Sequence, residues 1–188
     1  LAAGLNLDRF SVVNDFGAIA HAVPQLDTSD LAHVCGPKLP LPVEGVVSIV
    51  GPGTGLGVAM LLRRGSRDHV VECEGGHIGL SPTDDIDDTL LCLLRSRYPR
   101  VSYERVVSGS GLALLYEALA AIRGAQVAPA IDEKELWQAA LQGEDLDAVA
   151  ALQRFCKYLG AFAGDIALAH GASAVVIGGG LGSRLFKV

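Results

Sequence analysis

Two carboxylates and one imidazole stand near a pair of glycines in the middle of the chain. Glu74 is followed by Gly75, Gly76 and His77, and Glu104 comes later, at an expected helix start. The two glycines form a loop that can bring the side chains on either side of it to one point. A sugar hydroxyl both donates and accepts hydrogen bonds, and a carboxylate can accept from two neighbouring hydroxyls. These residues therefore predict a site for a polyhydroxylated ligand. A metal site is the competing interpretation, although a single imidazole without a cysteine pair disfavours zinc.

A glycine-rich segment directly follows an expected buried strand. Residues 51–57 read GPGTGLG, and Gly53, Thr54 and Gly55 lie at their centre. Backbone N–H groups in such a segment can approach a phosphate closely. The spacing differs from the dinucleotide fingerprint, because Leu56 stands at its third glycine, and it lacks the Gly-Lys-Ser/Thr of a P-loop. The residues that follow predict a strand, so we expect a phosphate-binding hairpin turn, with a ligand-free hairpin as the alternative.

Asn14 and Asp15 lie between an expected strand over residues 10–14 and an expected helix over residues 15–22. A carboxylate at a helix N-terminus is stabilised by the helix dipole. It can accept a proton from a substrate hydroxyl, which is the usual role of the base in phosphoryl transfer. Aspartate is also an ordinary N-cap residue, so a purely structural role for Asp15 is the alternative.

Gly178, Gly179 and Gly180 follow an expected buried strand over residues 173–177. Ligands of α/β sheets bind at the carboxyl ends of strands, so this position predicts a ligand contact. Close packing of a helix on the sheet is the alternative, because glycine also permits a close approach of two backbones.

The surrounding pattern predicts an α/β protein that holds these residues on a mixed sheet. Apolar runs bounded by turn residues predict strands, and a period of 3.6 residues predicts helices. The expected strands cover residues 45–50, 58–62, 69–73 and 173–177, and the expected helices cover residues 85–98, a short stretch after Ser102, 111–123, 132–142 and 145–170. Antiparallel strands followed by strand–helix alternation predict helices packed on the sheet. Residues 24–44 contain four prolines and are expected to form a connection that is a candidate lobe boundary.

Composition narrows the class of protein. The chain has 188 residues, 50% of them apolar, a formal net charge of −6 and a sequence pI near 5.3. These values exclude a disordered chain and predict one domain, or one domain and part of a second. The acidic balance argues against a nucleic-acid partner, and no apolar stretch is long enough to predict a membrane partner.

Two smaller sequence features complete this picture. The four cysteines lie far apart, which predicts reduced, buried thiols in a cytoplasmic protein rather than disulfides. The acidic run over residues 84–88 predicts a solvated helix start, because the helix dipole favours anions there.

Five segments together resemble the bacterial-type glucokinase family of the hexokinase/actin-like ATPase superfamily. They follow the family's order and extend over nearly the whole chain. The matching segments are VVNDFGAIAHAVPQL (12–26), GPGTGLGVA (51–59), EGGHIGLSP (74–82), SYERVVSGSGLALLY (102–116) and VVIGGGLGSRL (175–185). The cysteine-rich zinc motif of the related ROK kinases does not follow His77, so the resemblance is to the non-ROK branch.

The resemblance implies a ribonuclease H-like, actin-like ATPase fold and ATP-dependent phosphorylation of D-glucose at its 6-hydroxyl. It implies that Asp15 is the catalytic base, that Mg²⁺ accompanies ATP rather than occupying a protein metal site, and that the protein forms a homodimer. The implied contacts to the sugar hydroxyls are Asn14, Asp15, Glu74, His77 and Glu104. Those to the transferred phosphate are Gly53, Thr54 and Gly55, and those near the adenosine are Gly178, Gly179 and Gly180.

The chain departs from the family pattern at both ends. The N-terminal phosphate loop, an aspartate followed by paired glycines and a threonine, is absent, as is the C-terminal return to the small lobe. We therefore expect an internal fragment, inactive alone, with residues 1–25 as a remnant of the small lobe. Residues 26–188 would be a nearly complete, C-terminally truncated large lobe. The alternatives are a kinase for another hexose, such as mannose or an N-acetylhexosamine, and a non-catalytic sugar-binding or regulatory module.

Overall fold

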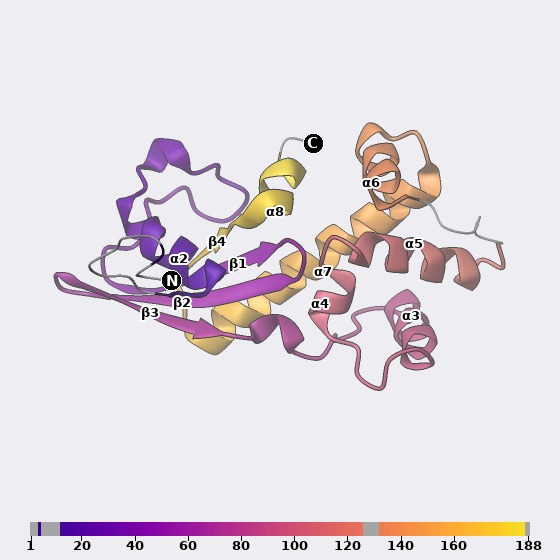
Figure 1. Ribbon diagram of the computed structural model, residues 1–188, viewed down its shortest axis with the longest axis horizontal. Helices are drawn as coiled ribbons and strands as arrows, with labels where there is room; N and C mark the ends of the chain where they lie inside the picture. Colours follow the sequence, from indigo (N-terminus) through magenta and orange to yellow (C-terminus); the bar gives the residue numbers. More distant parts are fainter. Residues whose placement is uncertain (1–3, 5–11, 126–131, 187–188) are drawn as a thin grey trace.

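The computed structural model describes residue 4 and residues 12–125 and 132–186, and it contains a sheet with helices on both faces (Figure 1). The sheet has four strands in the order β3-β2-β1-β4. Their bounds are Gly45–Pro52 for β1, Leu56–Arg64 for β2, Arg67–Cys73 for β3 and Ala174–Ile177 for β4. β2 is antiparallel to both β1 and β3, whereas β1 and β4 are parallel, which confirms the predicted mixed sheet.

Three of the four candidate segments lie at the same edge of this sheet. The parallel strands β1 and β4 end there at Pro52 and Ile177. Strand β3 also ends there, at Cys73 just before Glu74, because β3 and β1 are both antiparallel to β2. The turn between β1 and β2 closes at this edge, with Pro52 opposite Leu56. The topology therefore gathers loops that are far apart in the sequence.

Each face of the sheet packs against a helix. Helix α2 (Asp15–Ala22) covers one face of the sheet. Its Phe16 and Ala20, with Val23 just after it, share a core with alternate residues of the strands, namely Val47 and Ile49 of β1 and Ala59 and Leu61 of β2. Helix α7 (Leu146–His170) crosses the other face, where His170 Nδ1 lies 2.9 Å from Ser48 Oγ. Successive side chains of a strand point to opposite faces, so Ser48 faces α7 while its two neighbours face α2.

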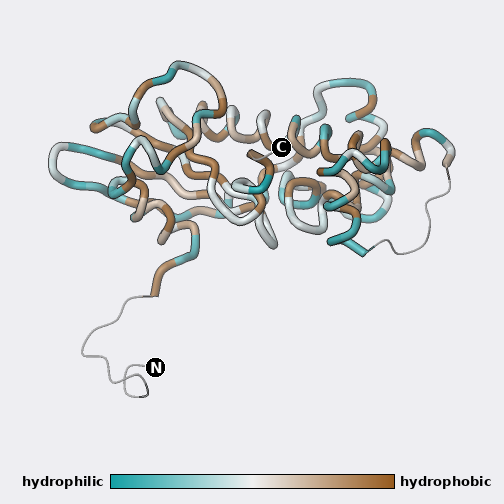
Figure 2. Tube along the Cα trace, turned by 90° about the horizontal axis from the view of Figure 1, so that it is seen from above, coloured by the Kyte–Doolittle hydropathy of each residue, from teal (hydrophilic) through white to brown (hydrophobic). Residues whose placement is uncertain are grey.

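The remaining helices pack around α7 beyond the end of the sheet (Figure 1). They are α3 (Asp85–Arg95), α4 (Tyr103–Val106), α5 (Gly111–Ile122) and α6 (Glu133–Gln142), close to the predicted ranges. Figure 2 shows the hydrophobic residues following the inner elements, with hydrophilic residues in several outer loops. Short 3₁₀ helices span η1 (Val23–Gln25), η2 (Thr28–Asp30) and η3 (Gly75–His77). Among the described residues, no helix is both long and apolar enough to cross a membrane.

The strand expected over residues 10–14 is wrong where the structure describes it. Residues 12–14 are not a strand, and residues 10 and 11 lie outside the described residues. Val12 and Val13 are exposed. Asn14 is the N-cap of α2, and its own N–H donates to Glu72 Oε1 at 3.0 Å. The helix cap and the bond to Glu72 hold Asn14 at the start of α2 rather than in a strand.

The cysteines and one helix also differ from expectation. All four cysteines, Cys35, Cys73, Cys92 and Cys156, are free and exposed rather than buried. Helix α8 (Gly179–Leu185) follows β4 directly and was not predicted, because glycine is a poor helix former. Its buried Gly182 packs against Ile177, so tertiary packing outweighs local propensity here.

The acidic run is only partly a solvated helix start. Asp84 is the N-cap of α3, as the dipole argument suggests, but the side chain of Asp87 is fully buried. Asp87 accepts hydrogen bonds from Tyr158 at 2.6 Å, from Arg154 at 2.6 Å and from the Thr83 hydroxyl at 2.7 Å. A buried carboxylate needs such partners to offset its loss of hydration. This Asp87 network joins the start of α3 to the middle of α7.

We predict that acid removes the stabilising effect of the Asp87 network. Burial by itself would raise the pKa of Asp87, but hydrogen bonds from Tyr158, Thr83 and Lys157 outweigh it and hold the pKa well below its usual range. A group whose pKa is lower in the folded state stabilises above its unfolded pKa and loses that effect as the pH falls through the folded value. The stability advantage of wild type over Asp87→Asn, measured by urea unfolding, should therefore be full above about pH 5 and shrink below about pH 4. The exposed Asp88→Asn is the control, and an advantage that is unchanged by acid would contradict this account.

Candidate active site

Glu74, His77 and Glu104 form one cluster at the edge of the sheet where β1, β3 and β4 end, here called the site edge. Glu74 directly follows β3, and the turn η3 folds His77 back toward it, with His77 Nε2 4.0 Å from Glu74 Oε2. On the other side, His77 Nδ1 lies 3.6 Å from Glu104 Oε1. Glu104 is in the first turn of α4, so a residue from the helical part meets the loop of the sheet. Glu74 and His77 are exposed, which leaves their polar atoms free to meet a ligand.

Glu104 also joins this cluster to the β1–β2 hairpin. Its Oε2 accepts the Leu56 N–H at 3.1 Å, while its Oε1 faces His77. A Cβ atom at Gly55 would lie 2.6 Å from Glu104 Oε2, so only glycine allows the carboxylate to approach the turn this closely. The structure therefore brings the predicted sugar-binding and phosphate-binding segments into direct contact.

The hairpin turn is held by residues that the sequence did not indicate. The Gly53 N–H donates to Gly55 O at 2.8 Å, which closes the turn, and Gly53 O accepts the Gly109 N–H at 2.8 Å. Gly109 O in turn accepts the indole N–H of Trp137 at 2.9 Å. Gly109 and Trp137 thus tie the hairpin to α6. Thr54 is exposed at the tip, and a Cβ atom at Gly53 would meet no atom within 4 Å, so space is open beside the turn.

Asn14 and Asp15 begin helix α2. Asn14 Oδ1 accepts the N–H groups of Phe16 and Gly17 at 2.9 and 3.3 Å, so Asn14, not Asp15, is the N-cap. Asp15 Oδ1 accepts the Phe16 N–H at 2.9 Å, and Oδ2 has no hydrogen-bond partner within the described residues. Glu72, which the sequence did not indicate, anchors this helix start through the Asn14 N–H. The absence of a side chain at Gly17 lets Glu72 approach.

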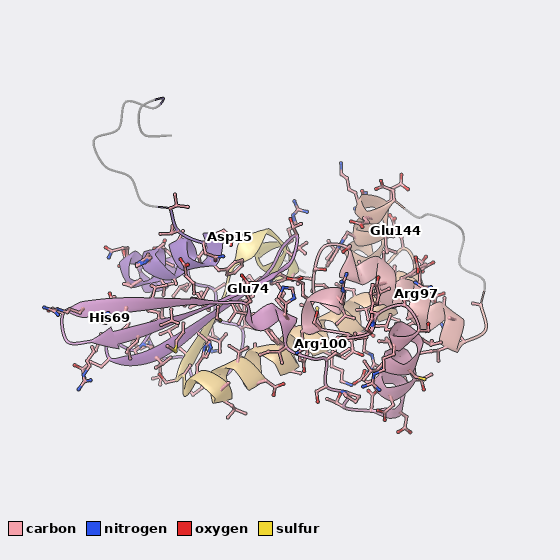
Figure 3. All side chains as sticks on the ribbon, turned by 60° about the horizontal axis from the view of Figure 1, so that its bottom comes forward. Asp15, His69, Glu74, Arg97, Arg100 and Glu144 are labelled. Atoms are coloured by element: carbon pink, nitrogen blue, oxygen red, sulfur yellow. The ribbon has the colours of Figure 1, made fainter. Side chains whose placement is uncertain are left out.

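Asp15 lies on the same side of the molecule as Glu74 (Figure 3). The adjacent Phe16 ring packs on the hairpin, where a Cβ atom at Gly51 would come within 2.6 Å of it. In the described part of the chain, no hydrogen bond or ion pair joins Asp15 to Glu74 or His77. The structure thus places Asp15 beside the hairpin but not in contact with the carboxylate–imidazole cluster.

The glycines after β4 pack closely on the end of β1. The Gly178 N–H donates to Val50 O at 2.8 Å, and a Cβ atom at Gly51 would lie 2.6 Å from Gly178 O. Gly179 has φ +83°, and its Cβ atom would lie 2.9 Å from Pro52 O. Gly180 is exposed, with nothing within 4 Å of a Cβ atom. Backbone packing therefore explains Gly178 and Gly179, while Gly180 faces open space.

We predict that Gly179→Ala distorts this edge, whereas Gly180→Ala is tolerated. Alanine at position 179 would need a left-handed conformation, which costs about 1–2 kcal/mol, and it would also push against Pro52 O. Thermal unfolding should show a lower melting temperature for Gly179→Ala and little change for Gly180→Ala. Equal melting temperatures for the two variants would contradict the close approach seen here.

The site has no arrangement suited to a protein-bound metal ion. Within residues 12–125 and 132–186, no group of three His, Cys, Asp or Glu side chains could hold one, and this includes Glu74, His77 and Glu104. The pairs within that cluster are joined by carboxylate–imidazole contacts instead. The arrangement can accept hydrogen bonds from several hydroxyls beside a glycine turn with open space.

Comparison with known proteins gives a consistent result along the whole chain. A family model described as Glucokinase matches residues 1–188. The curated glucokinase of Zymomonas mobilis subsp. mobilis is 56% identical over 181 residues, which cover 96% of this chain and 56% of that protein. The curated glucokinase of Caulobacter vibrioides is 41% identical over 180 residues, covering 94% of this chain and 53% of that protein.

A solved structure shares the fold as well. The crystal structure of a glucokinase from an Antarctic psychrotroph matches with a TM-score of 0.86 and 38% identity, covering 98% of this chain and 57% of that one. This likeness confirms the expected actin-like ATPase fold. The chain spans about half the length of the curated glucokinases that it matches.

Proposed function

The chain belongs to the glucokinase family, and on that premise we propose that the full-length protein containing it phosphorylates the 6-hydroxyl of D-glucose with ATP. The observation that carries this proposal is the position of Glu104, which touches both His77 and the backbone of the glycine hairpin. A site that accepts sugar hydroxyls thereby lies directly beside a turn suited to phosphate, as phosphoryl transfer to a sugar requires.

Asp15 is proposed as the general base. Its carboxylate stands in the first turn of α2, and its Oδ2 accepts no hydrogen bond from the described residues. It would take the proton of the 6-hydroxyl as the oxygen becomes a nucleophile. Asn14 would donate to a sugar hydroxyl through its amide N–H₂, because its Oδ1 is occupied by the helix cap. The carboxylates of Glu74 and Glu104, with His77, would hold the other hydroxyls.

The residues present fit a nucleotide at the same edge of the sheet. ATP would supply the phosphoryl group and Mg²⁺ would accompany it, since Mg²⁺ is usually bound through substrate phosphates. Gly53, Thr54 and Gly55 offer an open turn for the phosphates. Gly178, Gly179 and Gly180, at the carboxyl end of β4, would lie near the adenosine.

Three further features of the full-length protein are part of this proposal. Residues 1–25 would belong to a small lobe and residues 26–188 to a large lobe, whose closure over the sugar would exclude water. Free cysteines without disulfides among the described residues support a reducing, cytoplasmic setting. A homodimer is proposed from the family resemblance alone.

The test is formation of glucose 6-phosphate by the full-length protein, compared across glucose, mannose and N-acetylglucosamine. We expect glucose to have the highest kcat/KM, because an N-acetyl group needs room beside Glu74 and His77. A higher value for another sugar would favour a different hexose kinase. Glucose binding without turnover would favour a sugar-binding or regulatory module instead.

A further inference from the structure

A polar pocket of about 340 Å³ adjoins the proposed sugar site. It shares Glu104 with the sugar site and Thr54 with the proposed phosphate turn, and it extends from them between α3, α4 and α5. Its other polar lining side chains are Arg97, Tyr98, Arg105, Ser108, Ser110 and Glu117. None of these six has a role in the proposed phosphoryl transfer.

Of the cations that line this pocket, Arg105 has no carboxylate partner within the part of the chain that the structure describes. Arg97 is paired with Glu117, with Nη1 and Oε2 2.8 Å apart. The two oxygens of Glu104 are directed to Leu56 and His77. Arg105 lies with its guanidinium 4.6 Å from the centre of the Tyr98 ring and has no carboxylate partner among the described residues. A guanidinium stacked in this way is held in place while its N–H donors remain available.

Several hydrogen-bond donors at and before the start of α5 have no partner among the described residues. Ser108 is only 3% exposed, yet its hydroxyl forms no hydrogen bond within the described part of the chain. Helix α5 has twelve residues, and its N-cap, Ser110, makes no side-chain capping bond. The N–H groups of Leu112 and Ala113 also meet no acceptor in the described residues. The first N–H groups of a helix have no partner within the helix, and together with the Ser108 hydroxyl they give this side of the pocket donors that suit a ligand carrying acceptors.

We propose that this pocket is an anion subsite that binds a phosphate group, either as inorganic phosphate or as the phosphate of a sugar phosphate. A phosphate offers several oxygens to the guanidinium of Arg105, to the Ser108 hydroxyl and to the free N–H groups at the start of α5. A sugar phosphate would in addition place its hydroxyls toward Glu104, which lines both sites. This inference rests on the proposed function only for its account of Glu104.

The test is isothermal titration calorimetry of the full-length protein without nucleotide, using inorganic phosphate, glucose 6-phosphate and glucose as separate ligands. Arg105→Gln should weaken the binding of both phosphate ligands about tenfold or more, because a charge-assisted bidentate contact is lost. Ser108→Ala should weaken it less. Arg100→Gln is the matched control, since Arg100 is exposed, removes the same charge and does not line the pocket. It should bind as wild type does, and glucose binding should be unchanged in all three variants.

Each outcome has a distinct meaning. Weaker binding of both phosphate ligands in Arg105→Gln supports the subsite, and tight binding of glucose 6-phosphate alone identifies a sugar phosphate as the source. Phosphate binding that is equal in wild type and Arg105→Gln would place the anion elsewhere, for instance at the glycine hairpin, and overturn the proposal. Failure of wild type to bind either inorganic phosphate or glucose 6-phosphate would also overturn it. If Arg105→Gln fails to fold, Ser108→Ala and Arg105→Lys carry the same comparison. Failure of wild type to bind glucose would instead count against the proposed function.

Discussion

Replacing Asp15 with asparagine should nearly abolish glucose phosphorylation by the full-length protein while leaving glucose bound. Asparagine keeps the size of the side chain and can still accept the Phe16 N–H, so α2 should begin as before. It cannot take a proton from the 6-hydroxyl, and loss of a general base typically lowers kcat by about 10²–10⁴-fold. The measurement is steady-state formation of glucose 6-phosphate together with calorimetric binding of glucose.

The matched control is Asp68→Asn. Asp68 lies at the far end of the β2–β3 hairpin, where it pairs with Arg63 at 3.2 Å, away from the site edge of the sheet. It should leave kcat within about twofold, as surface substitutions away from a site usually have small effects. If Asp15→Asn retained turnover within about tenfold of wild type, Asp15 would be a helix-start residue rather than the base.

Local chemistry made most of the elements predictable from the sequence. Helices α3, α6 and α7 each begin at an aspartate whose carboxylate accepts backbone N–H groups, namely Asp84, Asp132 and Asp145. The continuous apolar run of β1 predicted a strand buried on both faces, and the residues from Val47 to Pro52 are all buried. The glycine pattern placed the hairpin turn. These signals act within a few residues, so a sequence displays them directly.

Contacts between distant segments were not predictable in the same way. Glu104 was a candidate sugar ligand, but nothing in its neighbourhood shows that its second oxygen holds the Leu56 N–H. Glu72 lies in a largely exposed strand, and its sequence surroundings give no sign that it anchors Asn14. The indole N–H of Trp137 donates to the Gly109 carbonyl and so holds the hairpin, which is far from Trp137 in the sequence. Such pairings depend on the strand order and helix packing of the whole chain.

The acidic run shows the same limit within five residues. Asp84 and Asp88 differ little from Asp87 in their sequence surroundings, and all three favour a helix start by the dipole argument. Only the packing of α3 on α7 selects Asp87 for burial, because that position faces Arg154 and Tyr158. A buried carboxylate in such a network is where a single substitution should cost the most stability.

Asp87→Ala should therefore lower the free energy of unfolding by about 3–5 kcal/mol, the usual cost of removing one partner from a buried charge network. The substitution leaves the buried Tyr158 hydroxyl without its acceptor. It also removes one of the two carboxylates that pair with Arg154, whose side chain is only 14% exposed. Urea unfolding of the full-length protein measures the loss. Asp87→Asn, which keeps the shape and can still accept the Thr83 hydroxyl, should lose less.

Asp84→Ala separates burial from charge in this prediction. Asp84 contacts the same Arg154 and Lys157, but its side chain is 41% exposed and water can replace the contacts that it loses. Exposed ion pairs contribute little, so Asp84→Ala should destabilise much less than Asp87→Ala. Equal losses for the two variants would mean that charge number, not burial, determines the contribution of this network. A large loss for Asp87→Ala alone would instead establish that the join between α3 and α7 depends on one desolvated carboxylate.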